Sequence, residues 1–87
     1  MFTNKAKDGA NNICGTNVAR FRKQMNISQR ELADLLQIEG LDIDKNAIQR
    51  IESGRRFVTD IELMTLSVVL RKSYEELLKA PEETNEK

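Results

Sequence analysis

Three helix-capping boxes constrain the architecture of this chain more than any other feature. In a capping box, a Ser or Thr hydroxyl accepts from the backbone three residues ahead, and the Glu there accepts from the N–H of the Ser or Thr. The pattern occurs at residues 28–31, 59–62 and 73–76. Each box precedes apolar residues at helical spacing, so the sequence predicts helices from Ser28 to just before Gly40, from Thr59 to about Arg71, and from Ser73 to just before Pro81.

Periodicity predicts two further helices. In residues 13–25, Val18, Phe21 and Met25 share one face, and Asn26 tolerates the left-handed conformation found just past helix ends. Residues 45–53 follow Asp44, a favourable N-cap, and direct an apolar side to the core. No stretch alternates as a strand would, so we expect an all-α, five-helix fold.

The predicted helix at 59–71 is apolar around almost its whole circumference, from Ile61 to Leu70. A helix of that kind is normally covered by its neighbours. We therefore expect it to be the buried helix of the fold.

Length and composition indicate a single globular domain. The chain has 87 residues, of which 39% are hydrophobic and 32% charged. We expect a flexible N-terminal arm at residues 1–12, a folded domain at 13–79 and a disordered acidic tail at 80–87. No segment resembles a signal peptide or a membrane span, which predicts a cytoplasmic protein without membrane contact.

The residue types present argue against catalysis. The chain has no histidine, and Cys14 is its only cysteine. The commonest general base, an internal disulfide and a zinc site with several thiolates are thereby excluded, and we expect Cys14 to be a buried, inert thiol. We therefore predict no enzyme activity, no metal and no cofactor.

Charge is segregated along the chain although its net value is zero. Residues 1–59 hold ten Lys and Arg against seven Asp and Glu, or +3, and residues 60–87 hold four against seven, or −3. Such an asymmetry favours one end that faces phosphate and another that faces solvent.

The outward side of the predicted helix at 45–53 has the chemistry of a base-reading surface. Amides bind adenine and basic side chains bind guanine, both bidentately, in the major groove. The alternative is an ordinary solvated helix face, where the same residue types are common, and this helix alone does not favour base reading over it. The candidate base contacts are Lys45, Asn46, Gln49 and Arg50.

The sequence resembles the phage-repressor and Cro-like helix-turn-helix proteins, the XRE family. The resemblance rests on NVARFR at residues 17–22, SQRELA at 28–33, AIQRIESGRR at 47–56, and residues 70–78. It implies a lambda-repressor-like fold, a recognition helix at 45–53 and binding to double-stranded DNA. The phosphate contacts that it implies are Gln29, Arg30, Ser53, Arg55 and Arg56, with Arg20 and Lys23 as possible additions.

The resemblance also implies that Arg22 and Glu52 form an ion pair between the first helix and the recognition helix. The alternative is two independent surface charges. An ion pair would hold the recognition helix in register.

The connection between the second and third helices departs from the family. It is about five residues longer than the usual turn, which has three or four. The second helix can gain a turn, with Leu41 and Ile43 anchoring the returning chain on the core, or the loop can project toward DNA. We favour the anchored loop.

We therefore expect a sequence-specific transcriptional regulator, most simply a repressor on a palindromic operator. The alternative is a protein-interaction module or antitoxin-like adaptor on the same scaffold. A homodimer on DNA and a protein partner acting as inducer or antagonist are both compatible with the sequence. Tyr74, Leu77 and Leu78 could supply a dimer surface, or they could belong to the core.

Overall fold

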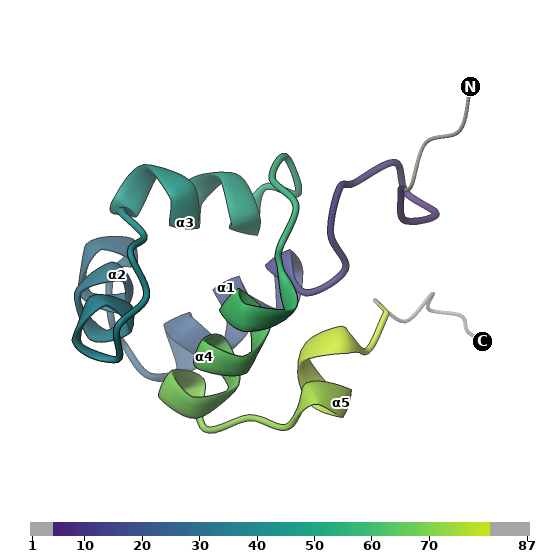
Figure 1. The fold of residues 1–87 in the computed structure, drawn as a ribbon. Coiled ribbons are helices and arrows are strands. Elements are labelled where there is room, and N and C mark those ends of the chain that lie inside the picture. Colours follow the sequence, from purple (N-terminus) through teal and green to yellow (C-terminus); the bar gives the residue numbers. More distant parts are fainter. Residues whose placement is uncertain (1–4, 81–87) are drawn as a thin grey trace.

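A computed structural model describes residues 5–80, and these contain helices and loops but no strand. The five helices are α1 (Gly15–Gln24), α2 (Gln29–Ile38), α3 (Lys45–Glu52), α4 (Asp60–Leu70) and α5 (Tyr74–Leu78) (Figure 1). The predicted all-α, five-helix architecture is confirmed.

The helix ends follow the local sequence signals. All three capping boxes form, at the starts of α2, α4 and α5. The Asp44 side chain caps α3 by accepting from the N–H of Ala47 at 2.8 Å. Asn26 adopts the left-handed conformation, with φ of 61°, directly after α1.

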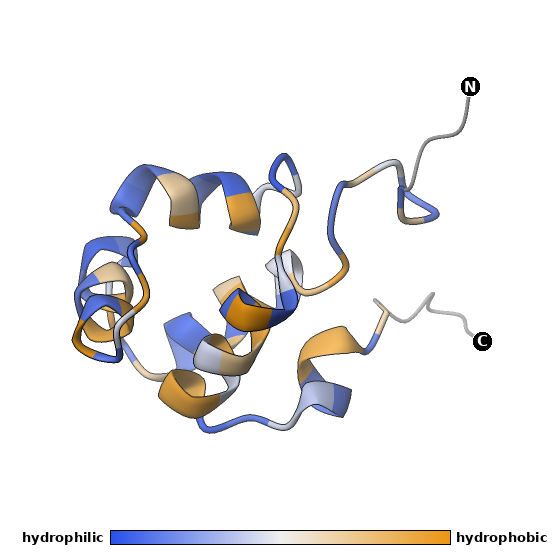
Figure 2. Ribbon diagram, in the orientation of Figure 1, coloured by the Kyte–Doolittle hydropathy of each residue, from blue (hydrophilic) through white to orange (hydrophobic). Residues whose placement is uncertain are grey.

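One core joins all five helices. α1 packs against α3, α4 and α5, and α2 packs against α3 and α4. Figure 2 shows α3 with its hydrophilic side outward and its hydrophobic side toward the other helices. The largest fully buried side chains are Leu32, Leu36, Ile48, Ile51, Leu66, Leu77, Val18 and Cys14.

A buried amide fixes the last helix. The Nδ2 group of Asn17 in α1 donates to the carbonyl oxygens of Leu77 at 2.7 Å and Lys79 at 2.9 Å. These carbonyls end α5, where the helical ladder leaves acceptors unpaired. Asn17 therefore ties the C-terminal helix to α1.

The prediction that α4 is buried on all sides is wrong. Leu66 and Leu70 are buried, but Ile61, Met64 and Val68 are 63%, 53% and 58% exposed. These three side chains share one face of α4, opposite the core. A fold of five short helices covers only one side of α4, because α1, α2 and α5 all pack on that side.

The long connection between α2 and α3 is anchored on the core, as favoured from the sequence. Ile43 is buried and Leu41 packs against the core while half-buried. The side chain of Gln37 donates to the carbonyl oxygen of Ile43 at 2.7 Å, which holds the returning chain against α2.

The N-terminal segment differs from the expected flexible arm. Residues 5–12 contain a turn, and their hydrogen bonds reach the loop between α3 and α4. Most of the predicted acidic tail, from residue 81 onward, lies outside the described residues. Within residues 5–80, no helix has the length and apolar character needed to cross a membrane.

Candidate nucleic-acid interface

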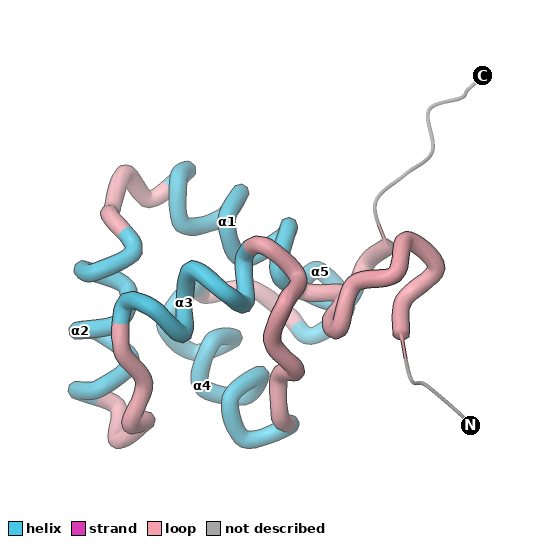
Figure 3. The backbone as a smooth tube through the Cα atoms, turned by 90° about the horizontal axis from the view of Figure 1, so that it is seen from above, coloured by secondary structure: helices cyan, strands magenta, loops and turns pink. Residues whose placement is uncertain are grey.

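The outward face of α3 carries four polar side chains with no internal partner. Because Ala47, Ile48 and Ile51 face the core, Lys45, Asn46, Gln49 and Arg50 face solvent. Among the described residues, none of these four side chains has a hydrogen-bonding or ion-pair partner. Viewed from above, α3 lies over the other helices (Figure 3).

At the start of α2, the Gln29 side chain is hydrogen-bonded within the protein, whereas the first backbone N–H groups of the helix have no intrahelical partner. The Nε2 group of Gln29 donates to Glu52 at 2.9 Å, so this amide is directed to α3. The Arg30 side chain is exposed. The first N–H groups of a helix have no intrahelical acceptor, and their positive end attracts anions. A phosphate contact here therefore depends on the backbone of residues 29 and 30 and on the Arg30 guanidinium.

The loop after α3 carries two arginines that the sequence analysis assigned the same role, and the structure gives them different surroundings. Arg55 is exposed, whereas the guanidinium of Arg56 binds both carboxylate oxygens of Glu62 at 2.8 and 2.9 Å. This hydrogen-bonded ion pair holds the pKa of Glu62 below its usual range. Arg56 thus ties the loop to the start of α4, and Arg55 is the freer candidate for phosphate.

Arg22 and Glu52 lie together in a cluster that joins α1, α2 and α3. The Arg22 Nε donates to one Glu52 carboxylate oxygen at 2.7 Å and its Nη2 to the other at 3.1 Å. Its remaining Nη1 donates to the carbonyl oxygen of Ile27 at 2.8 Å. The hydrogen bonds and the charge of Glu52 raise the pKa of Arg22. The two side chains are 11% and 7% exposed, so the pair is well shielded from water.

Two further residues that the sequence did not single out position the recognition helix. Asn12 accepts from the N–H of Gly15 at 2.8 Å and donates to the carbonyl oxygen of Ile51 at 3.0 Å. A Cβ added to Gly15 would collide with that same carbonyl oxygen. The start of α1 therefore touches the end of α3 directly. Asn12 stands just before Ile13, where the predicted helix begins, and this usual place of an N-cap was the one available signal. In the structure α1 begins two residues later, at Gly15.

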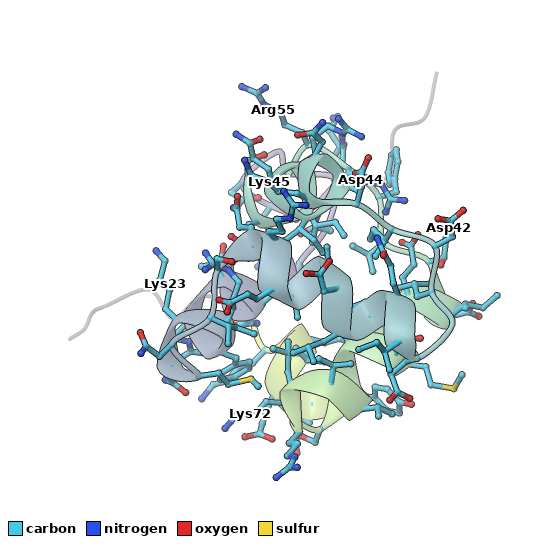
Figure 4. All side chains as sticks on the ribbon, turned by 90° about the vertical axis from the view of Figure 1, so that its left-hand side faces the viewer. Lys23, Asp42, Asp44, Lys45, Arg55 and Lys72 are labelled. Carbon is cyan, nitrogen blue, oxygen red and sulfur yellow. The ribbon has the colours of Figure 1, made fainter. Side chains whose placement is uncertain are left out.

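Two exposed cations lie on the part of the surface that carries α3. In Figure 4, Arg55 and Lys45 lie in the upper part of the molecule with α3, whereas Lys72 lies at the opposite end. Asp42 and Asp44 flank the surface at one side. Arg20 is directed elsewhere, since its Nη2 donates to Asn17 at 3.0 Å.

A model described as helix-turn-helix matches residues 18–77 of the sequence. The chain belongs to the helix-turn-helix family. The match runs from within α1 to within α5 and includes α2, α3 and the long connection between them. This XRE-type regulator binds DNA and acts in the control of transcription.

Among solved structures, the helix-turn-helix protein is similar to the restriction-modification controller protein C.AhdI from Aeromonas hydrophila. The two are 25% identical, with a TM-score of 0.64 over 74% of this chain and 86% of the controller protein. No curated protein matches the sequence significantly.

The described part of the chain holds no cluster of metal ligands and no reactive thiol. Within residues 5–80, no three His, Cys, Asp or Glu side chains stand close enough to hold a metal ion. Cys14 is buried, and burial raises the pKa of its thiol to about 11. The thiol is therefore protonated near neutral pH, as expected of a structural cysteine.

Proposed function

We propose that this protein is a transcriptional repressor that reads a palindromic operator by placing α3 in the major groove. The observation that carries the proposal is the row of four exposed and unpartnered side chains on α3. Gln49 and Arg50 stand at the C-terminal end of that row, about one turn before the C-cap Ser53. An amide and a guanidinium there suit adenine and guanine edges.

The neighbouring contacts are assigned to the DNA backbone. The start of α2 at Gln29 and Arg30 offers N–H groups to phosphate, and Arg55 offers its guanidinium at the far end of α3. The Ser53 hydroxyl donates to the carbonyl oxygen of Arg50 at 3.2 Å, so a phosphate contact by Ser53 requires this hydroxyl to turn outward. Arg56 acts by holding the loop through Glu62. Phosphate contacts position the protein without carrying sequence information.

The exposed face of α4 supports binding as a dimer. Ile61, Met64 and Val68, each more than half exposed, form an apolar row along one face of α4. We assign this row to a second copy of the chain, since a palindrome is matched by a two-fold symmetric protein. α5 can extend the contact, because Tyr74 and Leu78 are half-exposed, whereas Leu77 belongs to the core.

The operator is tested by selection from a random duplex pool near physiological salt. We expect an enriched palindrome with half-sites one helical turn, about 34 Å, apart. Gln49→Ala should change which bases are selected, whereas Arg55→Ala should weaken all sites alike. If nothing is enriched, or if both variants lower affinity uniformly, the base-reading assignment is wrong.

The dimer surface is tested separately by sedimentation. Met64→Asp should give a monomer that binds the full palindrome much more weakly than the wild type does. Ile38→Asp is a matched control, because Ile38 is also exposed but lies at the end of α2. Equal sedimentation of the wild type and both variants would exclude α4 as the dimer surface.

A further inference from the structure

The N-terminal segment is fastened to the end of the recognition helix, although it lies before the family match begins at residue 18. Asn11 and Asn12 supply all the donors that reach across, at 2.7 to 3.0 Å. The acceptors are the carbonyl oxygens of Ile51, Gly54, Arg55 and Arg56. Figure 1 shows the segment (purple) rising beside the loop that follows α3.

Close packing accompanies these hydrogen bonds. Gly54 has a φ of 80°, and a Cβ added to it would stand 2.9 Å from the Cβ of Ala10. A side chain at residue 54 would therefore be strained and would also push the segment away. The glycine that ends the recognition helix allows the N-terminal chain to lie against it.

These hydrogen bonds place Lys5 beside the loop that follows α3. The Nζ of Lys5 donates to the Oδ1 of Asn11 at 2.7 Å, while the Nδ2 of the same amide donates to the carbonyl oxygen of Arg55 at 2.8 Å. Asn11 thus links Lys5 to the backbone of the residue already assigned to phosphate. An open hollow between the segment and the loop is lined by Lys5, Asp8, Gly9, Ala10, Asn11, Ser53, Gly54 and Arg55.

We propose that this hollow binds a phosphate diester of the DNA backbone, with Lys5 and Arg55 as its two cations. The inference rests on the proposed placement of α3 in the major groove, because that placement brings the backbone past Ser53 and Arg55. Residues 5–12 are then a second, sequence-independent part of the DNA interface. Asn11 and Asn12 are its positioning residues.

The carboxylate of Asp8 also lines the hollow and would repel a bound phosphate. The proposal therefore predicts that removing a cation weakens DNA binding and that removing this carboxylate strengthens it. The Oδ1 of Asp8 accepts from the N–H of Ala10 at 3.0 Å and so stabilises the turn. Asp8→Asn keeps an acceptor for that N–H but removes the charge. Lys5→Gln keeps a donor for Asn11 but removes the cation.

The experiment measures affinity for duplex DNA between 50 and 200 mM salt. Each neutralised phosphate steepens the plot of log affinity against log salt by about 0.9. Lys5→Gln should flatten the slope by about 0.9 per protomer and weaken all sequences alike. Over this fourfold range of salt, the loss of affinity should shrink by about 3.5-fold per protomer. Asp8→Asn should bind more tightly than the wild type.

Lys7→Gln is the matched control, because Lys7 is exposed on the same turn but does not line the hollow. It should retain the wild-type slope. If Lys5→Gln and Lys7→Gln have the same slope while the wild type binds its selected operator, the hollow is not a phosphate site. If the wild type itself selects no sequence, the base-reading function fails instead, and Lys5→Gln still reports on the hollow through nonspecific duplex.

Discussion

Replacing Glu52 by glutamine tests the cluster that holds the recognition helix. The substitution keeps the shape of the side chain but removes its charge and one of its two acceptor oxygens. In the protein, these oxygens accept two hydrogen bonds from Arg22 and one from Gln29. The new amide nitrogen would face a donor on one of those two residues, and the Arg22 guanidinium would lose its counter-ion.

The expected cost follows from burial. Removing one partner of a buried ion pair costs about 3–5 kcal/mol, and a hydrogen bond to a charged group contributes about 1.5–3 kcal/mol. One acceptor survives in Glu52→Gln and the pair lies at the edge of the core, so we expect a loss of about 2–4 kcal/mol. For a domain of this size, each kcal/mol lowers the melting temperature by about 4–8 °C. The variant should therefore melt at least about 8 °C below the wild type.

Circular dichroism melts and urea titrations measure this loss, with Glu39→Gln as the control. Glu39 is exposed at the end of α2, and the same chemical change there should alter stability by less than about 0.5 kcal/mol. Arg22→Met and the double variant complete a mutant cycle. A coupling energy near zero between Arg22 and Glu52, or a melting temperature of Glu52→Gln within about 4 °C of the wild type, would refute the reasoning. If Glu52→Gln binds the operator as tightly as the wild type does, the ion pair does not position the recognition helix.

Three other substitutions test single contacts. Gly15→Ala should destabilise the fold by about 1–3 kcal/mol, because the new methyl group meets the carbonyl oxygen of Ile51, and a wild-type melting temperature would contradict this close approach. The pKa of Glu62 lies below its usual 4.5, so the bond between Glu62 and Arg56 stabilises the fold fully above that pH and is lost as the pH falls through the native pKa. The difference in unfolding free energy between the wild type and Glu62→Gln should therefore shrink on acidification. A difference that does not change with pH would contradict this role of the ion pair. Asp44→Ala should cost about 0.5–2 kcal/mol and speed amide exchange in the first turn of α3, whereas Asp44→Asn should keep the cap; equal exchange rates in both would exclude capping.

Local sequence was sufficient to predict the helices. Capping depends on residues three positions apart, so Ser28, Thr59 and Ser73 identified the starts of α2, α4 and α5 without knowledge of the fold. The side of α3 that faces solvent followed in the same way, because Ala47, Ile48 and Ile51 determine which side is buried.

The relative placement of the helices decided everything that depends on distant residues. The apolar circumference of α4 indicated burial, but only the packing of five short helices determines that Met64 stays more than half exposed. Arg55 and Arg56 are adjacent and chemically identical, yet one meets Glu62 in space and the other meets solvent. The sequence placed Asn11 in a flexible arm. Its acceptor, the Arg55 carbonyl oxygen, lies 44 residues away, and no local pattern indicates a contact of that range. Periodicity and capping report on contacts within a few residues, so a contact of this range becomes visible only in the folded chain.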